Sequence, residues 1–393
     1  MSASVPARFF SLDVLRGLAA LCVVFWHWQH FFFEGTQWVP FEGARQPFYD
    51  VAFVLYQKGW LAVDLFFSLS GFIFFWLYAG SINARKISGK TFFVLRFSRL
   101  YPLHIATFAF VLLAQSVFWW RHGDFFVYPF NDAYHGVLNI FMAAAWGFER
   151  GWSFNAPFWS VSVEILLYAL FFGLCLAVRL RTRVLLTLML AGLVLMPFNA
   201  LLGRGLFSFF VGGACFGVYR YGQADHRLRP ATILTMTAAA SLWLAVIAEV
   251  RLGWFWPEIQ AWLEMVPGMG LYIGANEVTR FGSSLIVTGL LFPLTIIALA
   301  LAETWRGHLG RRLAMIGNLS YSSYLLHFPL QLMLVLVMAE LGVNRSFFYS
   351  AASMMLFFGM LIPLAWLSYR FFEAPMQQAL RTRLLVRPVE RAL

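Results

Sequence analysis

Long apolar segments recur along the chain and constrain its fold more than any other feature. A helix needs about 20 apolar residues to cross a bilayer. Ten segments approach that length: 14–33, 60–79, 97–120, 159–179, 184–202, 205–221, 231–250, 281–302, 313–339 and 347–371. The 393 residues are 61% hydrophobic and 12% charged, whereas soluble domains are about 25% charged. We therefore predict an all-α, polytopic bundle of ten transmembrane helices.

Two segments fall outside this pattern. The apolar stretch 136–147 is too short to cross a bilayer, so we expect a re-entrant or interfacial helix there. The end of the chain is rich in arginine and too short to fold alone. We therefore expect an integral membrane domain over residues 1–380 and a basic cytoplasmic tail over residues 381–393.

The positive charge of the chain predicts its orientation. Basic residues gather in short loops between spans, which is the pattern that orients membrane proteins. With the N-terminus in the cytoplasm, 21 of the 29 basic residues fall on the cytoplasmic side. This distribution predicts that both termini lie in the cytoplasm (N-in and C-in). It also indicates that the net charge of +11 serves contact with membrane lipids and not binding of nucleic acid. The three cysteines show no metal-ligand spacing, so we expect no metal site.

The first span carries ionisable residues that a plain membrane helix does not need. Arg16 and His27 are eleven residues apart, close to three helical turns, so they share one face. Arg16 is expected at the inner mouth, paired with Asp13, and His27 near mid-membrane. A snorkelling Arg16 and a His27 satisfied by a neighbouring helix are the structural alternatives. His30 lies one turn further out, where it could line an outer cavity or be a plain interfacial residue, and we expect the latter.

A pair of arginines opens the third span. Arg96 and Arg99 are one turn apart in "LRFSRLYPLH" and face the same way. Such a pair suits phosphate, although it also fits an ordinary positive-inside flank. Tyr101 and Pro102 follow at an expected helix start or kink.

Two acidic residues lie within apolar runs near the outer boundary. Glu164 follows the helix-opening Pro157 in "NAPFWSVSVEILLY", and Asp64 lies in "VDLFFSLSGF". Buried acids in spans face a cavity or a partner, so both are candidates for binding a substrate. Pairing with an arginine for packing is the alternative for Glu164. The Ser70–Gly71 pair predicts a close helix approach or a break.

A polar stripe marks the ninth span, in "LSYSSYLLHFPL". Tyr321, Tyr324 and His327 follow at spacings of three and share one face. Pro329 is expected to free a backbone carbonyl nearby. The stripe is a candidate substrate contact, or a set of interhelical hydrogen bonds. Glu373, in the final "YRFFEAP", is interpreted as a structural helix end.

These motifs together resemble one known family. In order they are "LDVLRGLAALCVVFWHW", "VDLFFSLSGFIF", "RFSRLYPLH", "PFWSVSVEILLY", "LSYSSYLLHFPL" and "FFEAP". The chain resembles the acyltransferase family 3 membrane enzymes of bacteria over nearly its whole length, in the stand-alone form without an SGNH-type esterase domain.

The resemblance implies a multi-pass enzyme of the bacterial inner membrane that uses cytoplasmic acyl-CoA, most often acetyl-CoA, as co-substrate. It implies transfer to a hydroxyl of a glycan or glycolipid at the outer side. His27 and Arg16 are expected to be essential, with Glu164 beside them. Arg96, Arg99, Arg16 and Tyr101 are expected near the CoA, and Asp64, Tyr324, His327 and Glu164 near the acceptor.

Two questions stay open at this level. His27 could act as a general base or carry the acyl group as a nucleophile. A proton-coupled transporter or flippase would use intramembrane His and Glu equally well, although no inverted repeat with paired broken helices is visible. The acceptor, the acyl group and the oligomeric state are not readable from the residues.

Overall fold

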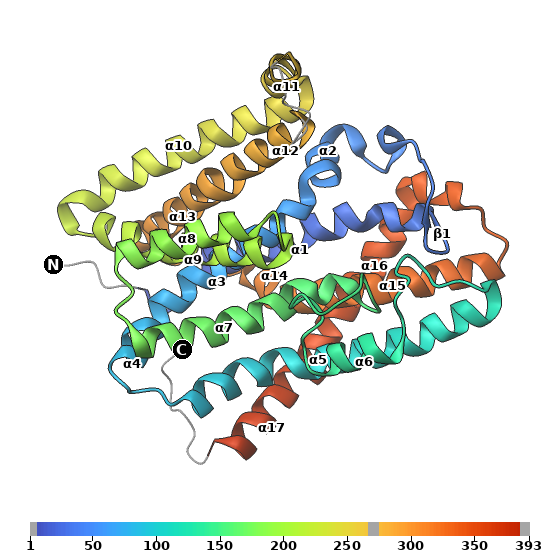
Figure 1. The fold of residues 1–393 in the computed structure, drawn as a ribbon, viewed down its shortest axis with the longest axis horizontal. Helices are drawn as coiled ribbons and strands as arrows, with labels where there is room; N and C mark the ends of the chain where they lie inside the picture. The colour runs from blue at the N-terminus through green and yellow to red at the C-terminus, as the bar shows by residue number, and fades with distance from the viewer. Residues whose placement is uncertain (1–5, 266–274, 386–393) are drawn as a thin grey trace.

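A computed structural model describes residues 6–265 and 275–385. Within these ranges nine helical segments are long and apolar enough to cross a membrane: Phe10–Phe32, Tyr49–Asn83, Gly89–His122, Ala156–Ala177, Ala200–Gly222, His226–Leu252, Ala275–Arg306, Ser320–Glu340 and Ala351–Leu384. Figure 1 shows most of them running side by side in one bundle. The prediction of an all-helical, polytopic membrane protein is confirmed.

The spans are built from the α-helices α1 (Phe10–Trp26), α2 (Tyr49–Lys58), α3 (Ala62–Phe74), α4 (Gly80–Asn83), α5 (Gly89–His122), α7 (Trp159–Ala177), α9 (Ala200–Gly222), α10 (Asp225–Leu252), α12 (Ala275–Ile286), α13 (Phe292–Arg306), α15 (Ser320–Glu340), α16 (Ala351–Leu367) and α17 (Ala374–Leu384). The remaining α-helices are α6 (Ala133–Ile140), α8 (Thr182–Leu195), α11 (Trp256–Glu264) and α14 (Ala314–Asn318). A small hairpin pairs β1 (Phe33–Glu34) with β2 (Gln37–Trp38).

Short helices of other types complete the structure. The 3₁₀ helices are η1 (His27–Phe32), η2 (Gly43–Arg45), η3 (Gly59–Leu61), η5 (Ala156–Phe158), η8 (Arg311–Leu313) and η9 (Arg345–Tyr349). The π-helical turns are η4 (Phe75–Ala79), η7 (Val287–Leu291) and η10 (Ser368–Glu373), each inside a span. π-turns often lie at functional sites, and η4 supplies a contact of the cavity described below.

The fifth expected span is shorter than predicted. Helix α8 has 14 residues, which is about 21 Å at 1.5 Å per residue, against a hydrocarbon core of about 30 Å. The chain turns back at residues 196–199, around Pro197, and Asn199 caps the start of α9. Nine helices of spanning length, rather than ten, therefore lie in the described part of the chain.

Three other boundaries differ from the prediction. The first span is an α-helix only to Trp26 and continues as the 3₁₀ helix η1. The ninth span is divided at Leu319 into α14 and α15. Pro102 lies inside α5, so the third span begins at Gly89 and not at the Tyr101–Pro102 step.

Helix α6 fits the interfacial role expected for residues 136–147. It has eight residues, too few to cross a bilayer. Its apolar side chains, such as Val137, point outward, while His135 and Asn139 are buried. This inside-out pattern suits a helix that lies against lipid and keeps its polar face in the protein.

The two ends of the bundle agree with the predicted alternation of loops. In Figure 1 the turn after α4 and the start of α10, both expected inside, lie on the left, and β1, expected outside, lies on the right, while α11, also expected outside, lies at the top beyond the far end of α10. Which end faces the cytoplasm stays a prediction. Helix α17 runs through the predicted domain boundary at residue 380, and Arg381 bonds Ser98 Oγ of α5 at 3.3 Å.

Helices α3 and α9 form the tightest contact of the core. A Cβ added at Gly71 would lie 1.9 Å from the backbone oxygen of Phe209, and one added at Gly212 would lie 1.9 Å from that of Ser68. Small residues let helix backbones touch in this way. The Ser70–Gly71 pair therefore marks a close helix approach and not a break, since α3 continues through it.

Candidate active site

Arg16 lies between α1 and the start of α15. Its guanidinium pairs with Asp13 at 3.1 Å, donates to the Gly317 carbonyl at 3.0 Å and donates to Ser320 Oγ at 3.1 Å. The pairing with Asp13 was predicted from the sequence. With 18% of its side chain exposed, Arg16 points into the bundle and does not snorkel away from it.

A cavity opens beside Arg16, between α1, α3, α5, α7 and α15. Arg16, Arg96 and Arg99 all line it, so the two predicted arginine motifs meet in space. Half of its other lining residues are apolar, and the polar half consists of Ser70, Ser160, Glu164, Tyr168, Ser320, Tyr321 and Tyr324. Three guanidinium groups face one carboxylate there, so the cavity attracts an anionic ligand.

Arg96 is the most enclosed of these cations. It is 8% exposed, its Nη2 donates to the Tyr78 hydroxyl at 2.5 Å, and its guanidinium lies over the rings of Phe74 and Tyr78. The π-turn η4 supplies Tyr78. Arg96 Nε is buried and has no hydrogen-bond partner among the described residues. A buried donor without a partner is costly, and a ligand oxygen would satisfy it.

Glu164 faces this cavity from α7. Its carboxylate accepts a hydrogen bond from Ser70 Oγ at 2.6 Å. The acid therefore lies on the arginine side of the site and pairs with a hydroxyl. Among the described residues, Glu164 forms no direct ion pair with an arginine, which was the alternative expectation.

His27 begins the 3₁₀ helix η1, where α1 ends, and reaches α15. Its Nδ1 lies 3.1 Å from His327 Nε2, and the two rings stack with centroids 4.9 Å apart. Arg16 contacts Ser320 and His27 contacts His327, so both follow the same side of α15, as the eleven-residue spacing predicts.

The hydrogen bonds fix the proton positions on this histidine pair. His327 Nδ1 lies 2.5 Å from the Tyr324 carbonyl, which can only accept, so Nδ1 of His327 carries the proton. In a neutral His327, Nε2 is then an acceptor, and His27 Nδ1 must donate to it. The proton of neutral His27 is therefore on Nδ1, and its Nε2 keeps a free lone pair.

His30 belongs to the same cluster. It is 5% exposed, and its ring lies 4.7 Å from that of His27. Gln331 donates from Nε2 to the His27 carbonyl at 2.9 Å and accepts from His30 Nδ1 at 3.0 Å. The Tyr128 hydroxyl then donates to His30 Nε2 at 3.3 Å. The expectation of a plain interfacial His30 is wrong, because the 3₁₀ geometry of η1 places residues i and i+3 one above the other.

Tyr324 connects the histidines to the cavity. Its hydroxyl donates to the Pro157 carbonyl at 2.7 Å and accepts from Ser160 Oγ at 2.8 Å. Its carbonyl holds His327, while its ring lines the arginine-lined cavity. Tyr324 and His327 therefore bridge the two halves of the site.

Two predicted site residues lie elsewhere. Asp64 is buried in an ion pair with Arg204 of α9 at 2.6 Å and does not line the cavity. Tyr101 stacks on Phe97 with ring centroids 4.4 Å apart, away from the cavity wall. Neither Asp64 nor Tyr101 therefore lines the cavity of Arg16, Arg96 and Arg99 or contacts His27 and His327.

Two further predictions concern structural groups. Glu373, in η10, accepts hydrogen bonds from Ser322 and Ser368, so it joins the last span to α15. Across residues 6–265 and 275–385, no three His, Cys, Asp or Glu side chains are arranged to hold a metal ion.

Comparisons with known proteins identify a family. Residues 9–370 match the family model described as an acyltransferase domain. The chain is 38% identical over 109 residues to "Protein 2 in picA locus" of Rhizobium radiobacter, covering 28% of this chain and 47% of that protein. It is 32% identical over 170 residues to "Acyltransferase MdmB" of Streptomyces mycarofaciens, covering 42% of this chain and 38% of that protein.

These alignments span less than half the length of either relative. No solved structure matches the chain. The family model, in contrast, covers nearly the whole described bundle, including both arginine motifs and the histidine pair. The chain, with its helices of membrane-spanning length, therefore belongs to the acyltransferase-domain family.

Proposed function

We propose that the protein transfers an acyl group, most simply acetyl, from cytoplasmic acyl-CoA to a hydroxyl of a glycan or glycolipid at the outer side of the bacterial inner membrane. One observation carries this proposal. Tyr324 lines the arginine-lined cavity, and its carbonyl accepts a hydrogen bond from His327, the partner of His27.

The cavity suits an acyl-CoA donor. Arg96 and Arg99 offer guanidinium groups to its phosphates, and Arg96 Nε has a donor to spare among the described contacts. The apolar walls, which include Phe66 and Phe67, fit the largely uncharged pantetheine arm. Arg16 holds the donor at the α1–α15 junction, and Glu164 balances part of the positive charge.

His27 acts as the general base. Its Nε2 lone pair accepts the proton of the acceptor hydroxyl as the hydroxyl oxygen attacks the thioester carbon. The carbon–sulfur bond then breaks, and the CoA thiolate takes up the proton from His27. The products are an O-acyl ester and CoA thiol, with no net proton change.

His327 positions this base. His327 Nε2 accepts a hydrogen bond from the Nδ1–H of His27, so the lone pair of His27 stays on its Nε2, as a hydrogen-bonded partner does for a catalytic histidine in other enzymes. Tyr324 holds His327 in turn.

The direct test is acyl transfer by His27→Ala. We expect transfer of radiolabel from acetyl-CoA to a glycan acceptor to fall by roughly 10²- to 10⁴-fold, with acetyl-CoA binding retained. His122→Ala, which changes an exposed histidine at the end of α5, is the matched control. Normal labelled product from His27→Ala would overturn the assignment, and export of an unmodified glycan would favour a transporter.

The donor site has a separate test. Arg96→Ala and Arg99→Ala should each raise the KM for acetyl-CoA while leaving the KM for the acceptor unchanged. An unchanged KM for acetyl-CoA in both variants would remove their assignment.

A further inference from the structure

Arg381 ties the last helix to the arginine motif of α5. It lies in the last turn of α17, and Figure 1 shows that helix beside the first half of α5. Its Nε donates to Ser98 Oγ at 3.3 Å, and its Nη2 donates to the Leu95 carbonyl at 3.3 Å. Leu95 and Ser98 directly precede Arg96 and Arg99 in the sequence. The three guanidinium groups are therefore close enough for their positive charges to repel one another.

This arginine cluster, Arg96, Arg99 and Arg381, has no acidic partner in the described part of the chain. The ion pairs within residues 6–265 and 275–385 include none of the three arginines. Helices α5 and α17 contain neither Asp nor Glu. Like charges held together raise the free energy of the empty site, so binding of an anion with several charges removes that cost.

Arg381 has hydrogen-bond donors to spare. An arginine carries five N–H donors in a planar fork, and the two contacts with α5 use two of them. The other three can bind a phosphate through charge-assisted hydrogen bonds. The contacts with α5 also hold the side chain in place before a ligand arrives, so less side-chain freedom is lost on binding.

The position of Arg381 matches one end of CoA. Arg96 and Arg99 line the cavity, whereas Arg381 does not. CoA carries its thiol at one end and a ribose with a 3′-phosphate at the other, with the pyrophosphate between them. When the thioester lies in the cavity and the pyrophosphate lies at Arg96 and Arg99, the 3′-phosphate lies further out, on the side of Arg381.

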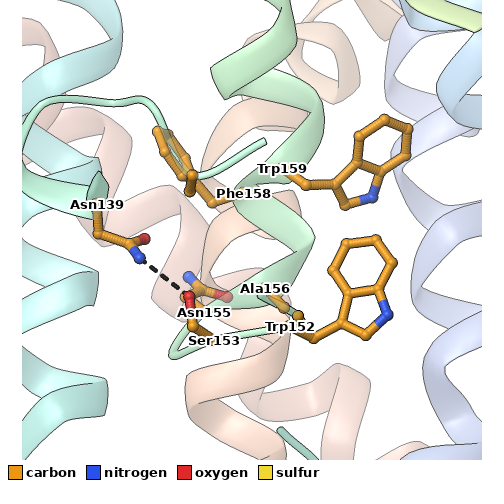
Figure 2. A pocket seen from close by; sticks show the side chains of 9 residues that line it. Asn139, Trp152, Ser153, Asn155, Ala156, Phe158 and Trp159 are labelled. Carbon is orange, nitrogen blue, oxygen red and sulfur yellow. Dashed lines mark hydrogen bonds between the residues drawn. The ribbon is translucent and has the colours of Figure 1, made fainter. Parts of the chain in front are cut away.

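The small cavity between α6 and the start of α7 does not compete for this end of CoA. Figure 2 shows its polar wall, in which Asn139 donates to Ser153 Oγ at 3.2 Å. None of the described residues that line it is charged, so a phosphate finds no cation there. Asn155 of the same wall donates from Nδ2 to the Leu325 carbonyl at 2.9 Å, and Pro329 leaves that carbonyl without its usual helical partner. This wall therefore holds α15 in place.

We propose that Arg381 binds the 3′-phosphate of CoA and makes the donor site selective for CoA over donors that lack this phosphate. Carrier-bound phosphopantetheine and 3′-dephospho-CoA both lack it. The inference rests on the proposed use of acyl-CoA and adds the residue that recognises the nucleotide end of the donor. The last turn of α17 then belongs to the donor site and is more than a basic tail.

The test compares acetyl-CoA with acetyl-3′-dephospho-CoA as donors for the purified full chain. In the wild-type protein we expect the KM for the dephosphorylated donor to be roughly tenfold higher, as the loss of a hydrogen bond to a charged group predicts. Arg381→Ala should raise the KM for acetyl-CoA to that of the dephosphorylated donor, whose own KM stays the same, with kcat unchanged. Arg381→Lys, which keeps the charge, should keep part of the difference. Arg383→Ala, which changes an exposed arginine of the same turn, is the matched control.

The outcomes separate this inference from the proposed function. Equal KM values for the two donors in the wild-type protein overturn the assignment. A KM that rises equally for both donors in Arg381→Ala also overturns it, because that result indicates only a strut between α5 and α17. A wild-type protein that turns over neither donor counts against the proposed function. The Kd values of CoA and 3′-dephospho-CoA, measured by isothermal titration calorimetry, then decide the role of Arg381: tighter binding of CoA that Arg381→Ala abolishes supports it, and equal values in the wild-type protein overturn it.

Discussion

Replacing His327 by Phe isolates the hydrogen bond that orients the base. A phenyl ring preserves the stacking on His27, where the ring centroids lie 4.9 Å apart, but it offers no acceptor at the Nε2 position. The Nδ1–H of His27 then has no partner on α15. A buried N–H without a partner costs about 1–3 kcal/mol, and His27 escapes that cost by moving its proton to Nε2 or by turning its ring.

Either escape removes the lone pair from the reacting position. A factor of ten corresponds to about 1.4 kcal/mol, so we expect kcat to fall roughly 5- to 150-fold. This loss is smaller than that expected for His27→Ala, because the base is still present. The KM for acetyl-CoA should stay unchanged, since the arginine-lined cavity keeps its walls.

The assay is steady-state transfer of radiolabelled acetyl from acetyl-CoA, with the thermal unfolding midpoint measured in the same detergent. His122→Phe is the matched control for introducing a phenyl ring in place of an imidazole. His327→Gln, which can offer an oxygen acceptor, should recover part of the activity. A His327→Phe variant that is folded and turns over at the wild-type rate would refute the tautomer reasoning.

Three further predictions concern the scaffold. Gly71→Ala should prevent accumulation of folded protein, because its Cβ would meet a backbone oxygen of α9 at 1.9 Å, whereas Gly217→Ala, which meets nothing within 4 Å, should express normally in a membrane-fraction assay. Asp64→Asn leaves the Arg204 guanidinium without its carboxylate partner, so it should reduce the free energy of unfolding by roughly 3 kcal/mol and leave the KM for acetyl-CoA unchanged. A raised KM with a normal free energy of unfolding would instead indicate that Asp64 binds substrate. The backbone N–H of His135 lowers the pKa of the Asp132 carboxyl. The carboxylate therefore stabilises the fold at pH values above its unfolded pKa of about 3.9, and this contribution disappears as the pH falls through the lower folded pKa. Asp132→Asn should lower the thermal unfolding midpoint at neutral pH, and equal midpoints for variant and wild type would contradict this account.

The predictions of which residues share a helix face succeeded because they depended only on helical periodicity. Arg96 and Arg99 lie on one helix, and Arg16 and His27 lie on one continuous span of α1 and η1, so the spacing within each pair predicts a shared face. The structure places each pair along one side of its helix. The freed carbonyl beside Pro329 was also predictable, because the cause lies in the same helix.

The failures depended on contacts between distant segments or on a change of helix type. Asp64 meets Arg204 from 140 residues away, and no local pattern announces that partner. His30 joined the cluster because the chain tightens from α to 3₁₀ at His27, which its apolar, aromatic sequence does not reveal. Asn155 captures the Leu325 carbonyl from a loop, where no periodicity applies.

The backbone contact between α3 and α9 bears on how the protein can move. Each helix presses a glycine against the other's peptide oxygens, at Gly71 and at Gly212, and Ser68 Oγ donates to the Ser208 carbonyl at 3.0 Å. At Gly71 and Gly212 even an added Cβ would lie within 2 Å of the opposing backbone, so the two helices are in direct backbone contact and this part of the bundle resists shear. An alternating-access cycle needs two halves that rock past one another, whereas a rigid chamber needs only substrates that reach in from either side. The locked register favours the second arrangement: under the function proposed above, the long pantetheine arm of acyl-CoA, and not a moving helix, would cover the distance across the membrane.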